Sequence, residues 1–295
     1  MRFDKKAKGS VLMGKKKNVL DFRRMKKEGD QVAWVTAYDF PTASFAEQAG
    51  IDMILVGDSL GMVVLGYQST IPVTMGDCIS HCKAVRRGAP STWVIGDMPF
   101  MSYQKSDEQA VENAGRFLKE ADTDCVKLEG GRRVASRIKA ITDAGILVMG
   151  HIGLTPQSSG QLGGFKAQGR DVISARELIK DALAVQEAGA FSILLEAVPP
   201  ELTAFITKKL EIPVYSIGAG QCDGQLLISG DMLGLFQAFT PKFVKKYAAV
   251  AEIEINALKE YVKEVKEGKF PTDDHVYHII DSVEQFNEMF KEFEV

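Results

Sequence analysis

The stretches WVIGD at residues 93–97 and CVKLE at residues 125–129 carry the pattern that decides the fold. Each is a short, largely apolar run that ends on a carboxylate. Six further apolar runs lie along the chain, at residues 33–39, 53–58, 147–151, 191–196, 214–218 and 226–231. Apolar runs that do not alternate with polar residues predict strands buried on both faces, and hence a parallel sheet covered by helices.

Helical patterns separate most of these runs. They cover residues 74–87, 106–121, 132–144, 174–188, 199–210 and 241–266, and several begin at a capping residue or end at a glycine. Eight strand–helix units in about 250 residues predict an α/β fold of the (β/α)8 class, the TIM barrel. An open doubly wound sheet is the alternative, but no Gly-x-Gly-x-x-Gly follows the first strand.

The composition is that of a soluble globular protein. The chain has 295 residues, of which 25% are charged, and its net charge of −3 gives no overall nucleic-acid signature. We find no apolar run of the ~18 residues that a membrane-spanning helix needs. Four cysteines are too few for a disulfide framework and favour a reducing, cytoplasmic location.

The two ends of the chain differ from the barrel pattern. The first 27 residues hold eleven Lys or Arg against two Asp, so we expect a basic arm at residues 1–17, either a solvated tail or a surface for RNA. A short helix at residues 19–27 is expected to close the bottom of the barrel. The barrel itself should cover residues 18–275. An amphipathic helix at residues 276–295 should pack on the barrel or on another subunit.

Acidic side chains end six of the eight apolar runs. In a barrel these ends form one face, where active sites lie. We expect Asp58, Asp97 and Glu129, at the ends of neighbouring strands, to share a divalent cation, because clustered carboxylates repel one another without one. Oxygen-only ligands favour Mg²⁺, or alternatively Mn²⁺, over zinc. For Asp39 and Asp231, capping of the next helix is an equal alternative.

Three more residues on this face suggest chemistry. Lys127 lies two positions before Glu129, so both side chains point the same way; it could pair with Glu129, bind a substrate carboxylate or form a Schiff base. Glu196 lies across the barrel and suits a general base. His151 could assist proton transfer or be a buried structural histidine. The glycine-rich segment 153–172 is a candidate lid.

The chain resembles the ketopantoate hydroxymethyltransferase family. The resemblance runs from about residue 19 to 275 and rests on nine motifs: TAYD at 36–39, VGDSLGM at 56–62, AVRRGAP at 84–90, DMPFM at 97–101, VKLEGG at 126–131, GHIGLTPQ at 150–157, LEAVP at 195–199, IGAG at 217–220 and PKF at 241–243.

This resemblance implies a Mg²⁺-dependent transferase with a barrel of the phosphoenolpyruvate/pyruvate type. Such an enzyme transfers a hydroxymethyl unit from 5,10-methylenetetrahydrofolate to 3-methyl-2-oxobutanoate through an enolate, giving 2-dehydropantoate for pantothenate and coenzyme A biosynthesis. It also implies a homo-oligomer, often a decamer. Carried onto this sequence, the metal ligands are Asp58, Asp97 and Glu129, the ketoacid-binding residues are Asp58, Ser59, Asp97 and Lys127, and the proton acceptor is Glu196.

Three other functions remain open at this point. The same barrel could be a Mg²⁺-dependent lyase that forms an enolate, or an aldolase with Lys127 as Schiff-base nucleophile. It could also be a non-catalytic RNA-binding barrel that uses its basic arm, although we expect neither a nucleic-acid nor a membrane partner. Folate dependence, chelation of the metal and salt-sensitive RNA retention would distinguish these functions.

Overall fold

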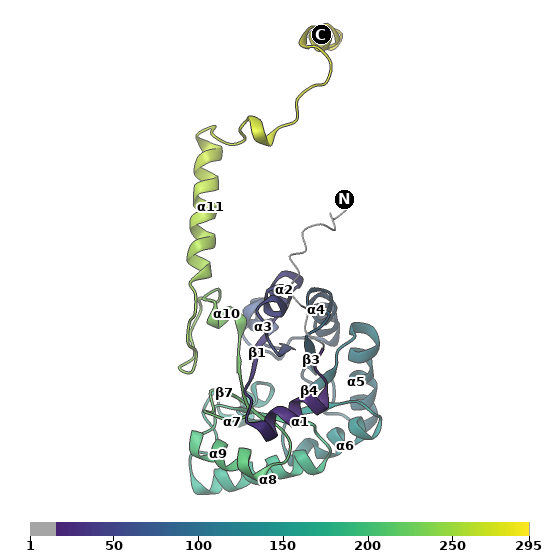
Figure 1. The fold of residues 1–295 in the computed structure, drawn as a ribbon, viewed down its shortest axis with the longest axis vertical. Coiled ribbons are helices and arrows are strands. Elements are labelled where there is room, and N and C mark those ends of the chain that lie inside the picture. The colour runs from purple at the N-terminus through teal and green to yellow at the C-terminus, as the bar shows by residue number, and fades with distance from the viewer. Residues whose placement is uncertain (1–15, 295) are drawn as a thin grey trace. The chain divides into compact units, whose positions relative to one another are not determined.

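A computed structural model describes residues 16–294, which form two compact units, one ending at Tyr247 and one beginning at Ala248 (Figure 1). The predicted basic arm falls outside the described residues except at its last two positions. There, Lys16 Nζ lies 2.6 Å from Asp124 Oδ1 and Lys17 Nζ lies 2.9 Å from Asp52 Oδ1. The predicted domain boundaries at residues 17 and 275 stay predictions.

The first unit is a closed barrel of eight parallel strands in sequential order, which confirms the predicted class. The strands are β1 (Val32–Thr36), β2 (Met53–Val56), β3 (Trp93–Asp97), β4 (Cys125–Glu129), β5 (Val148–Gly153), β6 (Ser192–Glu196), β7 (Val214–Ile217) and β8 (Gly224–Leu227).

Helices surround the strands on the outside (Figure 1). Five of them begin at a side-chain cap. Asp39 caps the helix that starts at Phe40, and Thr74 and Asp77 form a capping box on the helix that starts at Met75. The helical segments of this unit are α1 (Val19–Glu28), α2 (Phe40–Gln48), α3 (Leu60–Val63), α4 (Met75–Gly88), α5 (Asp107–Ala121), η1 (Arg132–Val134), α6 (Ala135–Asp143), η2 (Pro156–Ser158), α7 (Ser159–Leu162), α8 (Val172–Glu187), α9 (Pro200–Lys209) and α10 (Ser229–Met232).

The barrel interior changes from apolar to charged along its axis. On β3, Trp93 and Ile95 share the inner face with Asp97, because alternate residues of a strand point the same way. The apolar end is closed by α1, as predicted, where the Phe22 ring packs edge-on against Trp93 at a centroid distance of 5.3 Å. The charged side chains Asp97, Lys127 and Glu129 therefore lie at the carboxyl ends of their strands.

The structure corrects two predicted elements at the end of the barrel. The strand predicted at 226–231 is β8, which ends at Leu227, and residues 228–231 continue into α10. No helix separates β7 from β8. The helix predicted from residue 241 begins only at residue 250, because residues 241–243 line a cavity and the Tyr247 N–H donates to the Met232 carbonyl (2.7 Å).

The second unit holds α11 (Val250–Lys266), η3 (Asp273–His275) and α12 (Val283–Lys291). The amphipathic helix predicted at 276–295 is therefore shorter than expected and is capped by Ser282. Among residues 16–294, no helix is long and apolar enough to cross a membrane.

Candidate active site

The predicted site residues all line one cavity of about 810 Å³ at the carboxyl ends of the strands. The cavity is lined by Asp58, Ser59, Asp97, Lys127, Glu129, His151 and Glu196. Strand register explains most of this convergence, since Asp97 is paired with Lys127 and Glu129 with His151 in adjacent strands. Asp39 is absent from the lining, in keeping with its capping role.

Lys127 forms the centre of a buried charge cluster. Its Nζ atom lies 2.7 Å from Asp97 Oδ1, 3.4 Å from His151 Nδ1 and 3.8 Å from Glu129 Oε1. Burial alone would lower the pKa of Lys127, but the surrounding carboxylates outweigh it and raise that pKa. An amine that stays protonated is a poor nucleophile, so this geometry argues against a Schiff base.

Asp58 and Asp97 are neighbouring buried carboxylates whose ionised forms are disfavoured. The Asp58 backbone N–H donates to Asp97 Oδ2 at 3.0 Å. Burial, followed by repulsion from Asp97 and Glu129, raises the pKa of Asp58 well above its usual range. Burial also raises the pKa of Asp97, although Lys127 opposes the shift. These two side chains would both gain from a cation beside them.

Glu129 is stabilised as an anion by its neighbours. Burial opposes its ionisation, but interactions with His151 and Lys127 outweigh burial and lower its pKa. Its Oε2 atom accepts a hydrogen bond from the backbone N–H of Gln157 at 3.0 Å. Glu129 therefore balances the two cationic groups on β4 and β5.

Two residues of the site were not predicted. Gln157, on η2, donates from Nε2 to Asp58 Oδ2 at 2.9 Å. The hydroxyl of Tyr103 donates to Gln157 Oε1 (2.7 Å) and accepts from the Glu129 N–H (3.1 Å). The segment 153–172, expected to be a lid, thus holds Asp58 from behind through Gln157 and lines the cavity itself with Phe165 and Arg170, among others.

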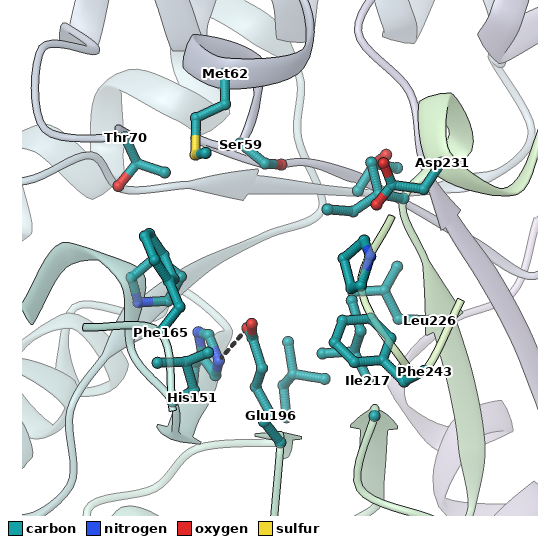
Figure 2. Close-up of a pocket in the computed structure, with 18 of the residues that line it drawn as sticks. Ser59, Met62, Thr70, His151, Phe165, Glu196, Ile217, Leu226, Asp231 and Phe243 are labelled. Atoms are coloured by element: carbon teal, nitrogen blue, oxygen red, sulfur yellow. Dashed lines mark ion pairs between the residues drawn. The ribbon is translucent and has the colours of Figure 1, made fainter. Parts of the chain in front are cut away.

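Glu196 and His151 form a pair that faces the cavity (Figure 2). His151 Nε2 lies 3.1 Å from Glu196 Oε2, and His151 Nδ1 lies 3.4 Å from Glu129 Oε1. Burial and the charge of Lys127 lower the pKa of His151, but the two glutamates outweigh them and raise it to about 9. The two carboxylates beside the ring thus favour the protonated form of His151.

The described residues suit a divalent cation in their donor chemistry. Within residues 16–294, no three Asp, Glu, His or Cys side chains are arranged closely enough to bind a metal ion. Instead, Lys127 contacts Asp97 and Gln157 contacts Asp58. Burial, together with the neighbouring carboxylates, nevertheless raises the pKa values of Asp58 and Asp97, so a cation beside them would favour their ionised forms. Carboxylate oxygens are the donors that Mg²⁺ prefers.

Comparison with known proteins identifies the family. The sequence profile described as ketopantoate hydroxymethyltransferase matches residues 16–273, which is most of the chain. The chain belongs to this family. A family relative in Alkaliphilus metalliredigens, named 3-methyl-2-oxobutanoate hydroxymethyltransferase, is 79% identical over 281 residues, covering 95% of this chain and 100% of the relative. A relative of the same name in Syntrophus aciditrophicus is 54% identical over 265 residues, covering 90% and 97%.

Solved structures support the barrel assignment of this ketopantoate hydroxymethyltransferase family member. Phosphonopyruvate hydrolase, solved with oxalate and Mg²⁺, aligns with a TM-score of 0.58 at 13% identity, covering 94% of this chain and 97% of that one. 2,3-Dimethylmalate lyase, a member of the PEP mutase/isocitrate lyase superfamily, aligns with a TM-score of 0.55 at 14% identity, covering 94% and 97%. At such identities the likeness shows the fold alone.

Proposed function

We propose that this chain transfers a hydroxymethyl unit from 5,10-methylenetetrahydrofolate to 3-methyl-2-oxobutanoate, giving 2-dehydropantoate for pantothenate and coenzyme A biosynthesis. The observation that carries the proposal is the placement of Glu196 beside a buried Lys127–carboxylate cluster in one cavity. The family membership supports the same activity. This reaction needs a base for a weakly acidic C–H bond and positive charge beside a ketoacid, and the cavity offers both.

We assign the ketoacid to the charged floor of the cavity. Asp58, Asp97 and Glu129 would hold Mg²⁺, which supplies Lewis-acid polarisation of the keto group when bound. Lys127 supplies positive charge for the substrate carboxylate. Ser59, whose hydroxyl lies 2.8 Å from the Tyr38 hydroxyl, contributes a hydrogen bond from the loop after β2.

Glu196 acts as the base. It takes the proton from C3 of the ketoacid, and the electron pair of that C–H bond becomes part of the enolate. C3 then forms a bond to the methylene carbon of the folate, and water supplies the oxygen of the new hydroxyl group. Both C–N bonds of that carbon break, their electron pairs go to N5 and N10, and these nitrogens take up the C3 proton from Glu196 and one proton from water as tetrahydrofolate leaves. His151 positions the Glu196 carboxylate and balances its charge, because it contacts Glu196 on one side and Glu129 on the other.

An assay with both substrates, with and without Mg²⁺, tests this function. We expect folate-dependent formation of 2-dehydropantoate that is abolished by chelation and restored by Mg²⁺. A Mg²⁺-dependent lyase would consume its substrate without folate. Absence of any folate-dependent product would overturn the proposal.

We also propose that the protein works in the cytoplasm as a homo-oligomer, a decamer by family resemblance. Small molecules are its expected partners. Light scattering on the full chain tests the assembly, and a monomer would contradict it.

A further inference from the structure

The cavity has a second polar wall that the proposed chemistry does not use. Asp231, on α10, lines the cavity and lies across it from His151 and Glu196 (Figure 2). The sequence allowed this residue to be a helix cap, but its carboxylate caps nothing, since α10 begins after Ile228 without a side-chain cap. A carboxylate in this position needs another explanation.

The Asp231 carboxylate faces the cavity and has no hydrogen-bond partner among the described residues. The residue is only 4% exposed, and no side chain or backbone N–H within residues 16–294 donates a hydrogen bond to its oxygens. Burial raises the pKa of Asp231 to about 6, with Lys246 opposing the shift. A buried carboxylate without donors is costly, so a ligand with N–H groups would find its acceptors already in place.

Apolar side chains lie between the two polar walls. Phe243 approaches the turn after β7 so closely that a Cβ on Gly218 would lie 2.5 Å from its ring. Phe165 lines the opposite side of the cavity (Figure 2). Phe236 and Phe239 also line the cavity, with ring centroids 5.5 Å apart. The space between Asp231 and Glu196 therefore suits a flat, apolar ring system.

Basic side chains line the outer part of the same cavity. Lys166, Arg170 and Lys242 are exposed and line it. None of the three is ion-paired within the part of the chain that the structure describes. They could therefore bind a ligand that carries carboxylates at its outer end.

We propose that this half of the cavity binds the folate co-substrate, with Asp231 accepting hydrogen bonds from the pterin ring. This inference rests on the proposed function. The pyrimidine part of a pterin presents a 2-amino group and a ring N–H side by side, which match the two oxygens of one carboxylate. Phe243 packs against the ring, and the three basic residues bind the glutamate tail.

The placement of Asp231 also orients the folate so that its methylene carbon faces the base. The pyrimidine edge lies at the end of the pterin that faces away from N5 and the methylene carbon. A pterin held by Asp231 on one wall therefore presents its methylene carbon toward Glu196 on the other. The cavity volume of about 810 Å³ lies within the range of sites for ligands much larger than a five-carbon ketoacid.

The variant Asp231→Asn tests the pterin contact, because it replaces one acceptor by a donor. The KM for methylenetetrahydrofolate should rise about 10- to 100-fold, as for loss of a charged hydrogen bond. Exchange of the C3 proton of 3-methyl-2-oxobutanoate with D₂O, measured without folate, reports the ketoacid half of the site separately. The matched control Asp39→Asn keeps its helix cap and should change neither quantity.

Each outcome separates the inference from the proposed function. An unchanged folate KM in Asp231→Asn would overturn the pterin contact while the function stands. Loss of C3 exchange in Asp231→Asn would instead show that Asp231 acts on the ketoacid, and this result would also overturn the pterin contact. If the wild-type protein shows neither exchange nor product, the proposed function itself fails.

The triple variant Lys166→Ala/Arg170→Ala/Lys242→Ala tests the tail contact. It should raise the KM for methylenetetrahydrofolate but not the KM for the corresponding pteroate, which lacks the glutamate. Asp231→Asn should raise both values. An equal effect of the triple variant on both compounds would contradict the assignment of the basic side chains to the tail.

Discussion

Lys127 Nζ lies 2.7 Å from Asp97 Oδ1, and the two side chains are 3% and 2% exposed. The two residues are direct partners in the register of β3 and β4, so the pairing of the strands itself places the opposite charges together. A buried ion pair of this kind contributes little net stability, but the loss of one partner leaves the other buried and unpaired.

Lys127→Met is therefore expected to destabilise the protein by about 3–5 kcal/mol in the free energy of unfolding. The substitution keeps much of the side-chain volume and leaves Asp58, Asp97 and Glu129 without their common cation. Urea denaturation measures the change. Lys139→Met is the matched control, because the exposed pair of Lys139 with Asp143 should be worth no more than about 0.5 kcal/mol. Equal effects of the two substitutions would refute the argument.

Glu196→Gln should lower turnover by roughly 10²–10⁴-fold, the usual size of a general-base contribution. The amide keeps the size of the side chain but cannot accept the C3 proton. Proton exchange at C3 should fall in parallel, whereas Glu187→Gln on the exposed end of α8 should retain full activity. Near-wild-type exchange in Glu196→Gln would remove this residue from the role of base.

Mg²⁺ should stabilise the protein independently of any activity. At a Mg²⁺ concentration about a hundredfold above its Kd, linkage predicts a gain of about 2.7 kcal/mol in the free energy of unfolding. Asp58→Asn should abolish most of this gain, whereas Asp143→Asn on the surface should preserve it. A Mg²⁺ effect that is identical in both variants would place the metal elsewhere.

Much of the site could be predicted from the sequence because the strand pattern itself carries the information. Residues two apart on a buried strand share a face, so Lys127 and Glu129 had to point the same way. Parallel strands in sequential order then brought Asp97, His151 and Glu196 to the same end of the barrel. Local periodicity and one general rule for barrels were sufficient for these positions.

Partners from loops and neighbouring strands were harder to predict. The sequence suggested a salt bridge between Lys127 and Glu129, but Asp97 is the closer partner (2.7 against 3.8 Å). Adjacent strands are ~4.8 Å apart, whereas residues two apart on one strand are separated by about 6.6 Å. Gln157 reaches the site only through the conformation of the loop after β5, which no periodic pattern specifies.

Asp231→Asn should make the protein more stable at neutral pH. Burial raises the pKa of Asp231 from 3.8 to about 6, so the folded state binds the proton more tightly than the unfolded state. Stability is then lost as the pH rises from about 4 to about 6, the reverse of a salt-bridged carboxylate. Because solvent in the cavity screens the charge, we expect a gain of about 1 kcal/mol at pH 7 in the variant.

Thermal unfolding of wild type and Asp231→Asn across pH 4 to 7 measures this difference. The two curves should coincide at the acidic end, where the wild-type carboxyl group is protonated, and separate above pH 5 with the variant more stable. Asp39→Asn should follow the wild-type curve throughout. A variant that is less stable than wild type at pH 7 would mean that Asp231 has a stabilising partner in the fold. A carboxylate paired in this way would not be free to accept hydrogen bonds from a ligand.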